Sequence, residues 1–584
     1  MANFYSNERN TQKLISLLKG HNIKRVIVSP GTTNVNFVGS IENDPFFELY
    51  SCVDERSAAY LACGMAAETN EPVVITCTAA TASRNYLSGL TEAFYSKLPI
   101  LAVTATQHTG KIGNNLPQVI DRTVQIKDTI RTSVHIPAVL STEDDEWSAN
   151  VLINKAILEL THNGGGPVHI NLQTNYTTSS LSHPKIEDER IIKRVGYKDS
   201  MPYIEAGKIG IYVGAHREWS FEETEIVDKF CSRYNAVVLC DNTSNFWGEY
   251  RVQAQLASYQ TRGSYEPSCF NLVIHIGNVS GSGIKINAKE VWRVNPDGEI
   301  RDTFRKLTKV FEMEEIDFFK HYVGNEKYNS HRELLDTWLS EYSRIERMIP
   351  EIPFSNIWIA RNTIQKLPKN SVVHFGIWNS LMSWNYFCPA QGMLGYSNTG
   401  GFGIDGCLSS LIGASLIKPN APYYGVFGDL AFFYDMNSIG NRHVSSNLRI
   451  LMVNNGCGGQ FHLSGNYSQR VGIPDAEVHE YIAAGGHFSN INPELTKMYV
   501  EALGFKYISA KTKKEYMENV SEFLSEKIGD KPIFFEVFVR YQDDAEAEDI
   551  IRSVDSTVSR GVRKMVKNVL GEESIQKVKK ILKK

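Results

Sequence analysis

The sequence predicts an α/β protein made of three successive doubly wound domains and a C-terminal helical tail. Two observations lead to this prediction. Short β-branched segments alternate with helical segments along almost the whole chain, which is typical of parallel sheets covered by helices. The alternation also falls into three stretches of comparable size, separated by polar or charged segments. With 584 residues, the chain is too long for one hydrophobic core.

The first domain is expected over residues 1–180. It closes near "GGGPVHINL" and is followed by the polar linker "TNYTTSSLSHPKIEDER". The expected elements are, in order, a helix with Leu14, Leu17 and Leu18 on one face, a strand at Arg25–Ser29, a strand ending at "CVDE", a helix at Arg56–Thr69, a strand at Val73–Cys77, a helix up to Tyr95, and a strand at Ile100–Thr104.

The second and third domains are expected over residues 195–345 and 350–545, and the tail over 546–584. The second begins at "KIGIYVGAH" and contains the strands "AVVLCDN", "LVIHIGN" and "EVWRVNP". A charged helical stretch from Met313 to Ile349 leads to the third, which ends with the strand "PIFFEVFV".

Composition narrows the functional class. The net charge of −4 gives no reason to expect nucleic-acid binding. The nine cysteines show no metal-ligand spacing and are expected to be reduced core thiols. The first twenty residues lack the apolar region of a signal peptide, and no apolar run is long enough to cross a membrane. These features predict a cytoplasmic protein.

The stretch "GDLAFFYDMNSIGNRHVSSNLRILMVNNG" places an acid after one strand and an amide after the next. Asp429 follows Gly428, and Asn455 follows the strand Arg449–Val453. Short oxygen ligands at neighbouring strand ends suit Mg²⁺, which takes its remaining ligands from phosphate. Gly428 would let the backbone approach a phosphate closely. An ordinary βαβ unit with polar turns is the alternative, and the spacing alone does not decide between them.

A second acid stands at a strand end in the first domain. Asp54 and Glu55 precede a helix rich in alanine and glycine, against which another helix or a cofactor ring can pack closely. Burial at such a place would raise the pKa of Glu55 and suit it to proton transfer. A surface acid that complements the helix dipole is the alternative.

Together, the two motifs and the three-domain order resemble the superfamily of thiamine-diphosphate-dependent decarboxylases and carboligases. The resemblance covers about residues 10–545 and is closest to the SEPHCHC synthases of the menaquinone pathway. The similar stretches are "SPG" (29–31), "VDERSAAYLACGMA" (53–66), "SNTGGFGIDGCLSS" (397–410), "GDLAFFYDMNSIGNRH" (428–443) and "NNGCGGQF" (454–461).

The resemblance implies roles for individual residues. Glu55 would hydrogen-bond the cofactor pyrimidine and, with Gln118, take part in catalysis. Mg²⁺ would be held by Asp429, Asn455 and the Cys457 carbonyl. Ile404 would prop thiamine in its bent conformation, with ordinary core packing of an isoleucine as the alternative. The remaining cofactor-binding positions implied are Ser380, Gly403, Gly428 and Leu430.

The chain departs from the SEPHCHC synthases where that family places substrate-binding arginines. Thr32-Thr33 replaces Ser-Arg, Gln107 and Thr399 replace arginines, and Trp384 stands where another is expected. Guanidinium groups bind carboxylates in a bidentate fork, so neutral residues predict a substrate with fewer carboxylates. With Gln118, these positions form the expected substrate site. The sequence favours pyruvate as donor and a carbonyl compound as acceptor. Two alternatives are 2-oxoglutarate as donor and a catalytically silent scaffold of the same fold.

Four further features lead to weaker expectations. The resemblance implies a homodimer or homotetramer, because the glutamate and the metal site lie in different domains. His108 and His462 are candidate proton carriers, with ordinary polar contacts as the alternative. The segment "GNVSGSG" (277–283) corresponds to a region that helps acetolactate synthases bind FAD, but a turn is the simpler explanation. The cysteine-containing loop "NNGCGGQ" carries one residue more than the family pattern.

The C-terminal residues Asp555–Lys584 carry nine Lys/Arg against three Asp/Glu and have apolar residues at helical spacing. Such a helix can lie on an anionic membrane surface, but packing against protein is favoured. We expect removal of residues 555–584 to leave cofactor-dependent catalysis intact. A truncated protein that folds but no longer binds thiamine diphosphate, measured by calorimetric titration, would contradict this.

Overall fold

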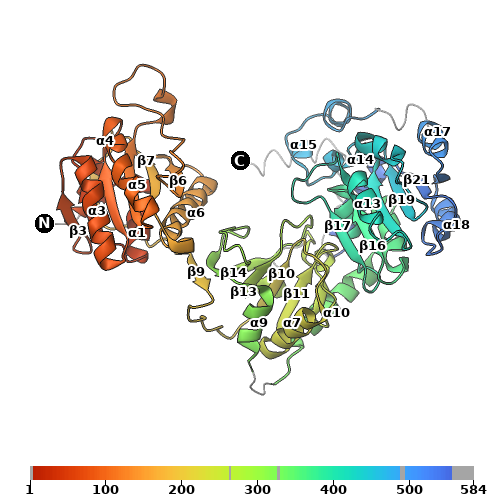
Figure 1. Cartoon of the computed structure of the whole chain (residues 1–584). Coiled ribbons are helices and arrows are strands. Elements are labelled where there is room, and N and C mark those ends of the chain that lie inside the picture. The colour runs from red at the N-terminus through yellow and green to blue at the C-terminus, as the bar shows by residue number, and fades with distance from the viewer. Residues whose placement is uncertain (1–3, 262–264, 325–328, 487–493, 556–584) are drawn as a thin grey trace, which may run out of the picture. The chain divides into compact units, whose positions relative to one another are not determined.

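The computed structural model describes residues 4–261, 265–324, 329–486 and 494–555 (Figure 1). Contacts divide the chain into two compact units. The first contains residues 1–201 and 297–312, and the second contains 202–296 and 313–584. The three sheets of parallel strands confirm the predicted α/β class. The exact domain boundaries stay a prediction, and the basic tail lies outside the described residues apart from its first part.

The first unit contains a six-stranded parallel sheet with helices on both faces. The strand order is β3-β2-β4-β5-β7-β6. The strands are β2 (Arg25–Val28), β3 (Glu48–Ser51), β4 (Val73–Cys77), β5 (Ile100–Thr106), β6 (Thr132–Ile136) and β7 (Val168–Gln173). The helices are α1 (Arg9–Gly20), α2 (Val35–Ile41), α3 (Glu55–Thr69), α4 (Thr81–Asn85), α5 (Leu87–Tyr95) and α6 (Glu143–Glu159).

Two hydrophobic clusters cover the two faces of this sheet. Val26 and Val74 pack with α1 and α6 on one face, whereas their neighbours Ile27 and Ile75 pack with α3 and α5 on the other. Successive strand residues point to opposite faces, so strands buried on both sides are apolar throughout. The single helix expected up to Tyr95 is two shorter helices that meet at the buried Tyr86.

Two further strand pairs belong to the first unit. β1 (Tyr5–Ser6) pairs antiparallel with β8 (Leu181–His183), and β9 (Lys193–Gly196) pairs parallel with β15 (Leu307–Glu312). The returning segment 297–312 is held to this unit by polar contacts. Asp302 accepts a hydrogen bond from Trp147 Nε1 at 2.9 Å and pairs with Arg190 at 2.7 Å.

The second unit contains two parallel sheets. One has the order β12-β11-β10-β13-β14, with β10 (Ile209–Val213), β11 (Ala236–Cys240), β12 (Arg251–Gln253), β13 (Cys269–Ile276) and β14 (Asn287–Val294). Its helices are α7 (Phe221–Tyr234), α8 (Gln255–Ser258), α9 (Glu315–Val323) and α10 (Glu333–Met348).

The other sheet has the order β17-β16-β18-β19-β21-β20 and carries the Asp429 motif. Its strands are β16 (Val372–Phe375), β17 (Leu394–Ser397), β18 (Tyr423–Gly428), β19 (Leu448–Asn454), β20 (Lys506–Ala510) and β21 (Ile533–Phe538). Its helices are α11 (Asn356–Thr363), α12 (Asn379–Trp384), α13 (Cys407–Ser415), α14 (Asp429–Asp435), α15 (Tyr467–Arg470), α16 (Asp475–Glu477), α17 (Glu494–Ala502), α18 (Lys513–Phe523) and α19 (Tyr541–Arg552).

No helix in the described part of the chain is long and apolar enough to cross a membrane.

Candidate active site

The Asp429 motif lies at the carboxyl edge of its sheet. β18 and β19 are parallel neighbours, with Gly428 paired to Val453, so Asp429 and Asn455 leave the sheet side by side. The chain runs from β16 outward to β17 and then returns to β18 on the other side of β16. In open α/β sheets, ligands bind beyond the carboxyl ends of strands at such a reversal.

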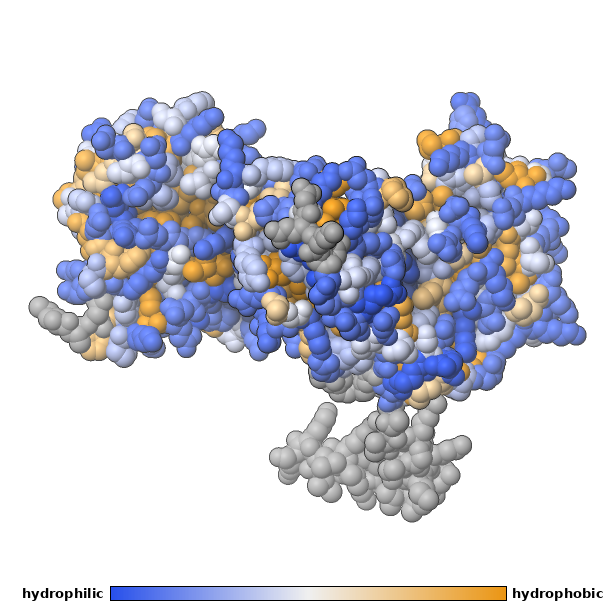
Figure 2. All heavy atoms as spheres, turned by 90° about the horizontal axis from the view of Figure 1, so that it is seen from below, coloured by the Kyte–Doolittle hydropathy of each residue, from blue (hydrophilic) through white to orange (hydrophobic). Residues whose placement is uncertain are grey.

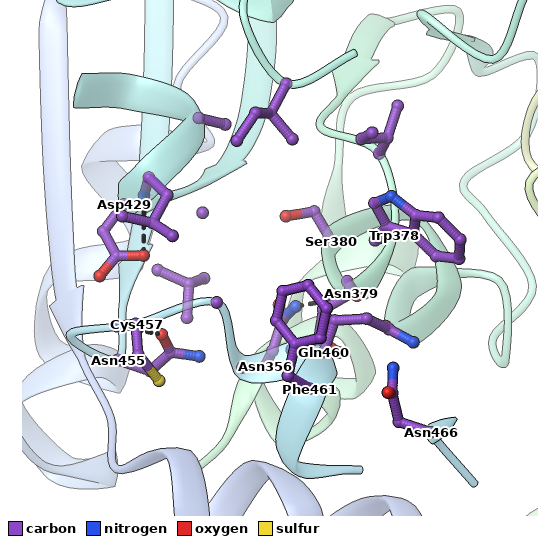
Figure 3. Close-up of a pocket in the computed structure, with 18 of the residues that line it drawn as sticks. Asn356, Trp378, Asn379, Ser380, Asp429, Asn455, Cys457, Gln460, Phe461 and Asn466 are labelled. Carbon is purple, nitrogen blue, oxygen red and sulfur yellow. Dashed lines mark hydrogen bonds between the residues drawn. The ribbon is translucent and has the colours of Figure 1, made fainter. Parts of the chain in front are cut away.

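A pocket of about 410 Å³ lies at this edge. It brings together seven of the residues that the sequence points to: Ser380, Ile404, Gly428, Asp429, Leu430, Asn455 and Cys457. In Figure 3, Asp429, Asn455 and Cys457 lie on one side of the pocket, and Ser380, Trp378 and Asn466 lie on the other. The Asp429 carboxylate therefore shares one side of the pocket with Asn455, while the Ser380 hydroxyl and the Asn466 amide lie across from it.

Asp429 connects the Gly428-Asp429 half of the motif to the Asn454-Asn455 half through hydrogen bonds of its carboxylate. It is the first residue of α14, where its Oδ1 accepts a hydrogen bond from Leu430 N at 2.9 Å. Its Oδ2 accepts one from Gly456 N at 2.8 Å. The buried carboxylate is thus oriented by backbone donors from both strand ends, and the helix N-terminus favours its negative charge.

Asn455 is oriented by a buried acid that sequence reasoning missed. Its Nδ2 donates to Asp544 Oδ2 at 2.9 Å, and its Oδ1 accepts from Cys457 N at 3.3 Å. Asp544 also accepts from Asn356 N at 2.7 Å. Because the amide nitrogen is committed to Asp544, the amide oxygen is the atom left for a cation. Nothing in the local sequence marks Asp544, which lies almost ninety residues beyond Asn455 on α19.

Burial shifts the pKa values of two acids on α19. It raises the pKa of Asp544 to about 6, against the lowering effect of the Asn455 and Asn356 hydrogen bonds. Burial also raises the pKa of Glu548 to about 7, although this carboxyl accepts a 2.8 Å hydrogen bond from Tyr386 Oη and lies near Arg552. Both neutral forms are therefore favoured by folding.

Replacing Glu548 with glutamine is expected to flatten the pH dependence of stability. The folded pKa of about 7 exceeds the ordinary 4.5, so the folded state binds the extra proton more tightly. The stability that the Glu548 proton adds to the folded state is fully present below about pH 4.5 and is lost as the pH rises through 7. It amounts to at most roughly 3 kcal/mol of unfolding free energy, at about 1.4 kcal/mol per tenfold change in proton affinity.

Urea unfolding midpoints at pH 5 and pH 8 measure this effect. Glu548→Gln keeps an oxygen that can accept from Tyr386 and should lose less stability than the unmodified protein between the two pH values. Glu546→Gln, at an exposed position of α19, is the matched control and should behave as the unmodified protein. Equal losses in all three proteins would contradict the assignment.

Apolar side chains form much of the rest of the pocket lining. These are Ile377, Trp378, Phe402, Ile404, Val453 and Phe461. A Cβ added to Gly428 would meet nothing within 4 Å, so the backbone there borders open space. Gly403 does not line the pocket, because its Cα faces Asp405, whose Oδ1 would lie 2.4 Å from an added Cβ.

The first unit carries the other predicted catalytic residue at the carboxyl edge of its own sheet. Glu55 begins α3, directly after β3, and its Oε2 accepts a hydrogen bond from Asn85 Nδ2 at 3.1 Å. Asp54, not Glu55, caps the helix by accepting from the backbone of Arg56 and Ser57. The Glu55 side chain is thus half-buried and is oriented by Asn85. It does not cap the helix, so its carboxylate stays available for another partner.

Three predicted substrate residues follow strands of the same sheet, and the fourth, Gln118, lies farther along the loop between β5 and β6. Thr32 and Gln118 are exposed, and Gln118 has a positive φ of 59°. Thr33 is buried, with its hydroxyl bonded to that of Thr78. Gln107 accepts a hydrogen bond from Lys111 Nζ at 2.8 Å. The structure therefore gathers Thr32, Thr33 and Gln107 at the strand ends that also position Glu55.

Two expected substrate residues do not reach the pocket. Trp384 has no exposed surface, packs at a tilt against Phe375 and donates from Nε1 to Asn356 Oδ1 at 3.2 Å. Its large ring fills the core behind Asn356, so the expectation of a substrate-facing Trp384 is corrected. Thr399 is also buried outside the lining, near Gly281. The tryptophan that does line the pocket is Trp378, whose positive φ of 57° turns the chain just before α12.

The remaining candidates have ordinary contacts. His108 is exposed and its Nδ1 accepts a hydrogen bond from Gly110 N at 3.0 Å. His462 is buried, with its Nδ1 at 2.9 Å from Asp475 Oδ1. In the 277–283 segment, the Ser280 hydroxyl donates to Asp241. None of these three residues lines the pocket.

The donor set of the pocket fits a divalent cation with a phosphorylated ligand. One carboxylate and one amide oxygen are oriented toward the same edge, and the apolar lining beyond them suits an organic ring. A hard cation takes oxygen ligands and completes its coordination with phosphate and water. The arrangement can therefore hold a cofactor by its phosphates at one end and by an aromatic portion at the other.

Comparisons with known proteins identify relatives of this chain. Residues 9–126 match the family model described as thiamine pyrophosphate enzyme, N-terminal TPP binding domain. The chain is 28% identical over 573 residues to a 2-succinyl-5-enolpyruvyl-6-hydroxy-3-cyclohexene-1-carboxylate (SEPHCHC) synthase of Bacteroides thetaiotaomicron, covering 93% of this chain and 98% of the relative. It is 26% identical over 594 residues to the enzyme of the same name from Bacteroides fragilis, with the same coverage.

A solved structure also matches this chain, that of a thiamine diphosphate-dependent 4-hydroxybenzoylformate decarboxylase from Rhodococcus jostii RHA1. The match covers 92% of this chain and 100% of that chain, at 14% sequence identity and a TM-score of 0.38. The sequence matches span the motifs around both Glu55 and Asp429. The chain is thus similar over most of its length to SEPHCHC synthases, and its residues 9–126 match the TPP-binding domain of the thiamine-diphosphate-dependent enzymes.

Proposed function

We propose that this enzyme uses thiamine diphosphate with Mg²⁺ to decarboxylate a 2-oxo acid, with pyruvate as donor, and to transfer the resulting acyl unit to a carbonyl acceptor. The observation that carries the proposal is the convergence of Asp429 and Asn455 at one end of a pocket whose other lining residues include Ser380 and Ile404. When bound, thiamine diphosphate supplies the electron sink that accepts the electron pair released as CO₂ leaves.

The protein's own residues would hold and orient that cofactor. Asp429 and the Asn455 amide oxygen would bind Mg²⁺, with the Cys457 carbonyl as a third ligand. Gly428 and Leu430 would border the diphosphate, and Ile404 would support the ring system. Glu55 would hydrogen-bond the pyrimidine and move a proton there. The apolar lining would exclude water from the reacting carbon.

Neutral residues support a monocarboxylic donor. Thr32, Thr33 and Gln107 offer neutral hydrogen-bonding groups at the strand ends beside Glu55. A charge-assisted hydrogen bond contributes about 1.5–3 kcal/mol, so the loss of even one arginine fork weakens recognition of a second carboxylate by about 10- to 100-fold. We therefore expect pyruvate to exceed 2-oxoglutarate in kcat/KM.

Competition between the two donors measures this preference. CO₂ release is followed with each 2-oxo acid alone and with both together, in the presence of Mg²⁺ and thiamine diphosphate. A higher kcat/KM for 2-oxoglutarate, with isochorismate accepted, would overturn the pyruvate proposal. No CO₂ from any 2-oxo acid, despite cofactor binding, would favour the silent scaffold.

One observation favours the alternative donor. Arg122 is buried in the first unit, and its Nη2 donates to the Ala105 carbonyl at 2.8 Å. Its Nε and Nη1 have no hydrogen-bond partner among the residues that the structure describes. This cation bonds the backbone of β5 one residue before the strand ends at Thr106, and its two unpaired nitrogens could bind a second carboxylate. The Arg122→Gln variant should therefore be included in the donor competition.

We also propose that the enzyme works as a homodimer or a dimer of dimers. The exposed side chains around α3 and β3 include Tyr50, Val53, Tyr60 and Leu61, with Val53 78% exposed. Figure 2 shows apolar surface patches on the molecule. Large exposed side chains gathered around one helix and one strand are typical of protein interfaces. Sedimentation velocity of the full chain gives the assembly state, and a stable monomer that retains full activity would contradict the proposal.

A further inference from the structure

A second cluster of ligand-bearing side chains lies beside the pocket and is not used by the proposed reaction. Cys457, His462 and His479 bring one sulfur and two ring nitrogens to within 4.8 Å of one another. They come from the loop after β19, a 3₁₀ turn at Gly459–His462 and a π-helical turn at Val478–Ile482. Cys457 and His462 are buried, at 2% and 5% exposure, and His479 is half-buried.

Two nitrogens of this cluster are buried without a partner. His462 Nε2 and His479 Nδ1 have no hydrogen-bond partner among the described residues. Buried polar atoms in folded proteins are almost always hydrogen-bonded, because an unsatisfied one costs free energy. Two such atoms, on rings that each bring a nitrogen within 4.8 Å of the Cys457 sulfur, point to a ligand that binds all three residues.

The orientation of His462 suits metal binding. Its Nδ1 lies 2.9 Å from Asp475 Oδ1, so Nδ1 carries the proton and Nε2 presents its lone pair to the cluster. A carboxylate that holds the other nitrogen of a ligating histidine fixes the ring and raises its basicity, and this is the usual arrangement around protein-bound metals.

Neighbouring groups also hold both imidazole rings in place. The Tyr541 ring lies 4.1 Å from the His462 ring and 4.7 Å from the His479 ring, and its hydroxyl lies 3.4 Å from Asp475 Oδ2. On its other side, His479 packs on Gly485, where an added Cβ would lie 2.2 Å from Nε2. This contact directs His479 Nε2 toward the glycine and leaves Nδ1 for the cluster.

We propose that Cys457 Sγ, His462 Nε2 and His479 Nδ1 bind one Zn²⁺, at a position separate from the Mg²⁺ position at Asp429 and Asn455. Zn²⁺ takes nitrogen and sulfur ligands in tetrahedral geometry, at about 2.0–2.1 Å and 2.3 Å. The ligand atoms would have to move together by roughly 1 Å, which rotation of side chains supplies. A thiolate favours Zn²⁺ over Mg²⁺, which takes oxygen ligands.

The charge of the surroundings also favours a cation. The Asp429, Asp544 and Asp475 carboxylates lie close enough to Cys457 to interact with it electrostatically. The same negative groups attract a divalent ion. In Figure 3 the Cys457 sulfur projects away from the Asp429 carboxylate, so one residue can offer its carbonyl to one metal and its sulfur to another.

A metal here would fasten a surface segment to the cofactor-binding loop. The backbone already joins them, since Gly458 N donates to Ala483 O at 2.6 Å and Gly486 N donates to Gly456 O at 3.3 Å. The ion would add side-chain bonds between the same two segments. Because Cys457 is two residues from Asn455, occupancy of this site would stabilise the loop that carries the amide.

Cobalt substitution tests the site directly. The full-length protein is stripped with a chelator and titrated with Co²⁺, without thiamine diphosphate or Mg²⁺. We expect one Co²⁺ per chain, with a thiolate-to-cobalt charge-transfer band that Zn²⁺ abolishes and excess Mg²⁺ does not. Removal of a group that only orients a ligand costs about 10- to 100-fold in metal affinity, so Cys457→Ala or His479→Gln should cost at least about 100-fold.

Matched variants separate this site from others. Cys231→Ala, a buried cysteine of α7, and His443→Gln, an exposed histidine of the same sheet domain, should bind Co²⁺ as the unmodified protein does. Asp429→Asn should keep the thiolate band. Circular dichroism checks folding, and His479→Gln supplies an independent test if Cys457→Ala does not fold. Absence of the band, or equal Co²⁺ affinity in the His479→Gln protein, would overturn the proposal.

Discussion

The Asp429→Asn protein is expected to bind thiamine diphosphate at least about 100-fold more weakly than the unmodified protein at a fixed Mg²⁺ concentration. The substitution removes the charge that would face the metal. It also places an amide NH₂ group where a carboxylate oxygen accepts from Leu430 N or from Gly456 N. A lost charge-assisted bond costs about 1.5–3 kcal/mol, and a donor that meets a donor adds to that cost.

Calorimetric titration with thiamine diphosphate measures the affinity. Asp405→Asn is the matched control, because Asp405 is an exposed carboxylate of the same domain outside the pocket lining. It should retain the unmodified affinity. Equal affinities for Asp429→Asn and the unmodified protein would show that the cofactor does not depend on this carboxylate, and the proposed metal position would be wrong.

The Glu55→Gln protein is expected to lose about 10²- to 10⁴-fold in kcat, the range in which a positioned acid or base contributes to catalysis. Glutamine keeps the size of the side chain and can still accept from Asn85 Nδ2, so the local structure should persist. It cannot exchange a proton. The affinity for thiamine diphosphate should change far less than the rate, which separates a role in proton transfer from a role in binding.

Initial rates of CO₂ release from pyruvate, together with cofactor titration, measure the two quantities. Glu68→Gln, an exposed glutamate on the same helix α3, should keep the full rate. Asn85→Ala removes the neighbour that orients Glu55 and should lower kcat to a smaller extent than Glu55→Gln. A Glu55→Gln protein with an unchanged kcat would remove Glu55 from the mechanism.

The fold was largely predictable because its strands and helices are distinct in sequence. Val73–Cys77 is the strand β4 without change, and the ends of β2 and β5 lie one and two residues from the expected positions. Strands buried on both faces are continuous apolar runs, which sequence patterns show clearly. The break at Tyr86 between α4 and α5 was missed, since both halves have helical composition.

Residue patterns alone predicted the candidate site only where its residues follow strands directly, whereas Ser380 and Ile404 were expected from the family resemblance. Asp429 and Asn455 do, and parallel neighbours bring their strand ends together. Asp544 and His479 do not, because tertiary packing alone carries them to the motif from α19 and from the turn after α16. Trp384 was misplaced for a related reason. Trp378 and Trp384 flank the short helix α12, and only the packing of that helix decides which one faces the pocket.

The return of residues 297–312 to the first unit determines which fragment of this chain can fold alone. A polypeptide that stops at residue 201 would contain β9 without its partner β15, and Arg190 and Trp147 without Asp302. Its exposed strand edge would be open to pairing with other chains. A fragment meant to fold alone therefore requires residues 1–201 joined by a short designed linker to residues 297–312. A fragment that ends in the linker after the first sheet, at residue 201, would instead be expected to aggregate.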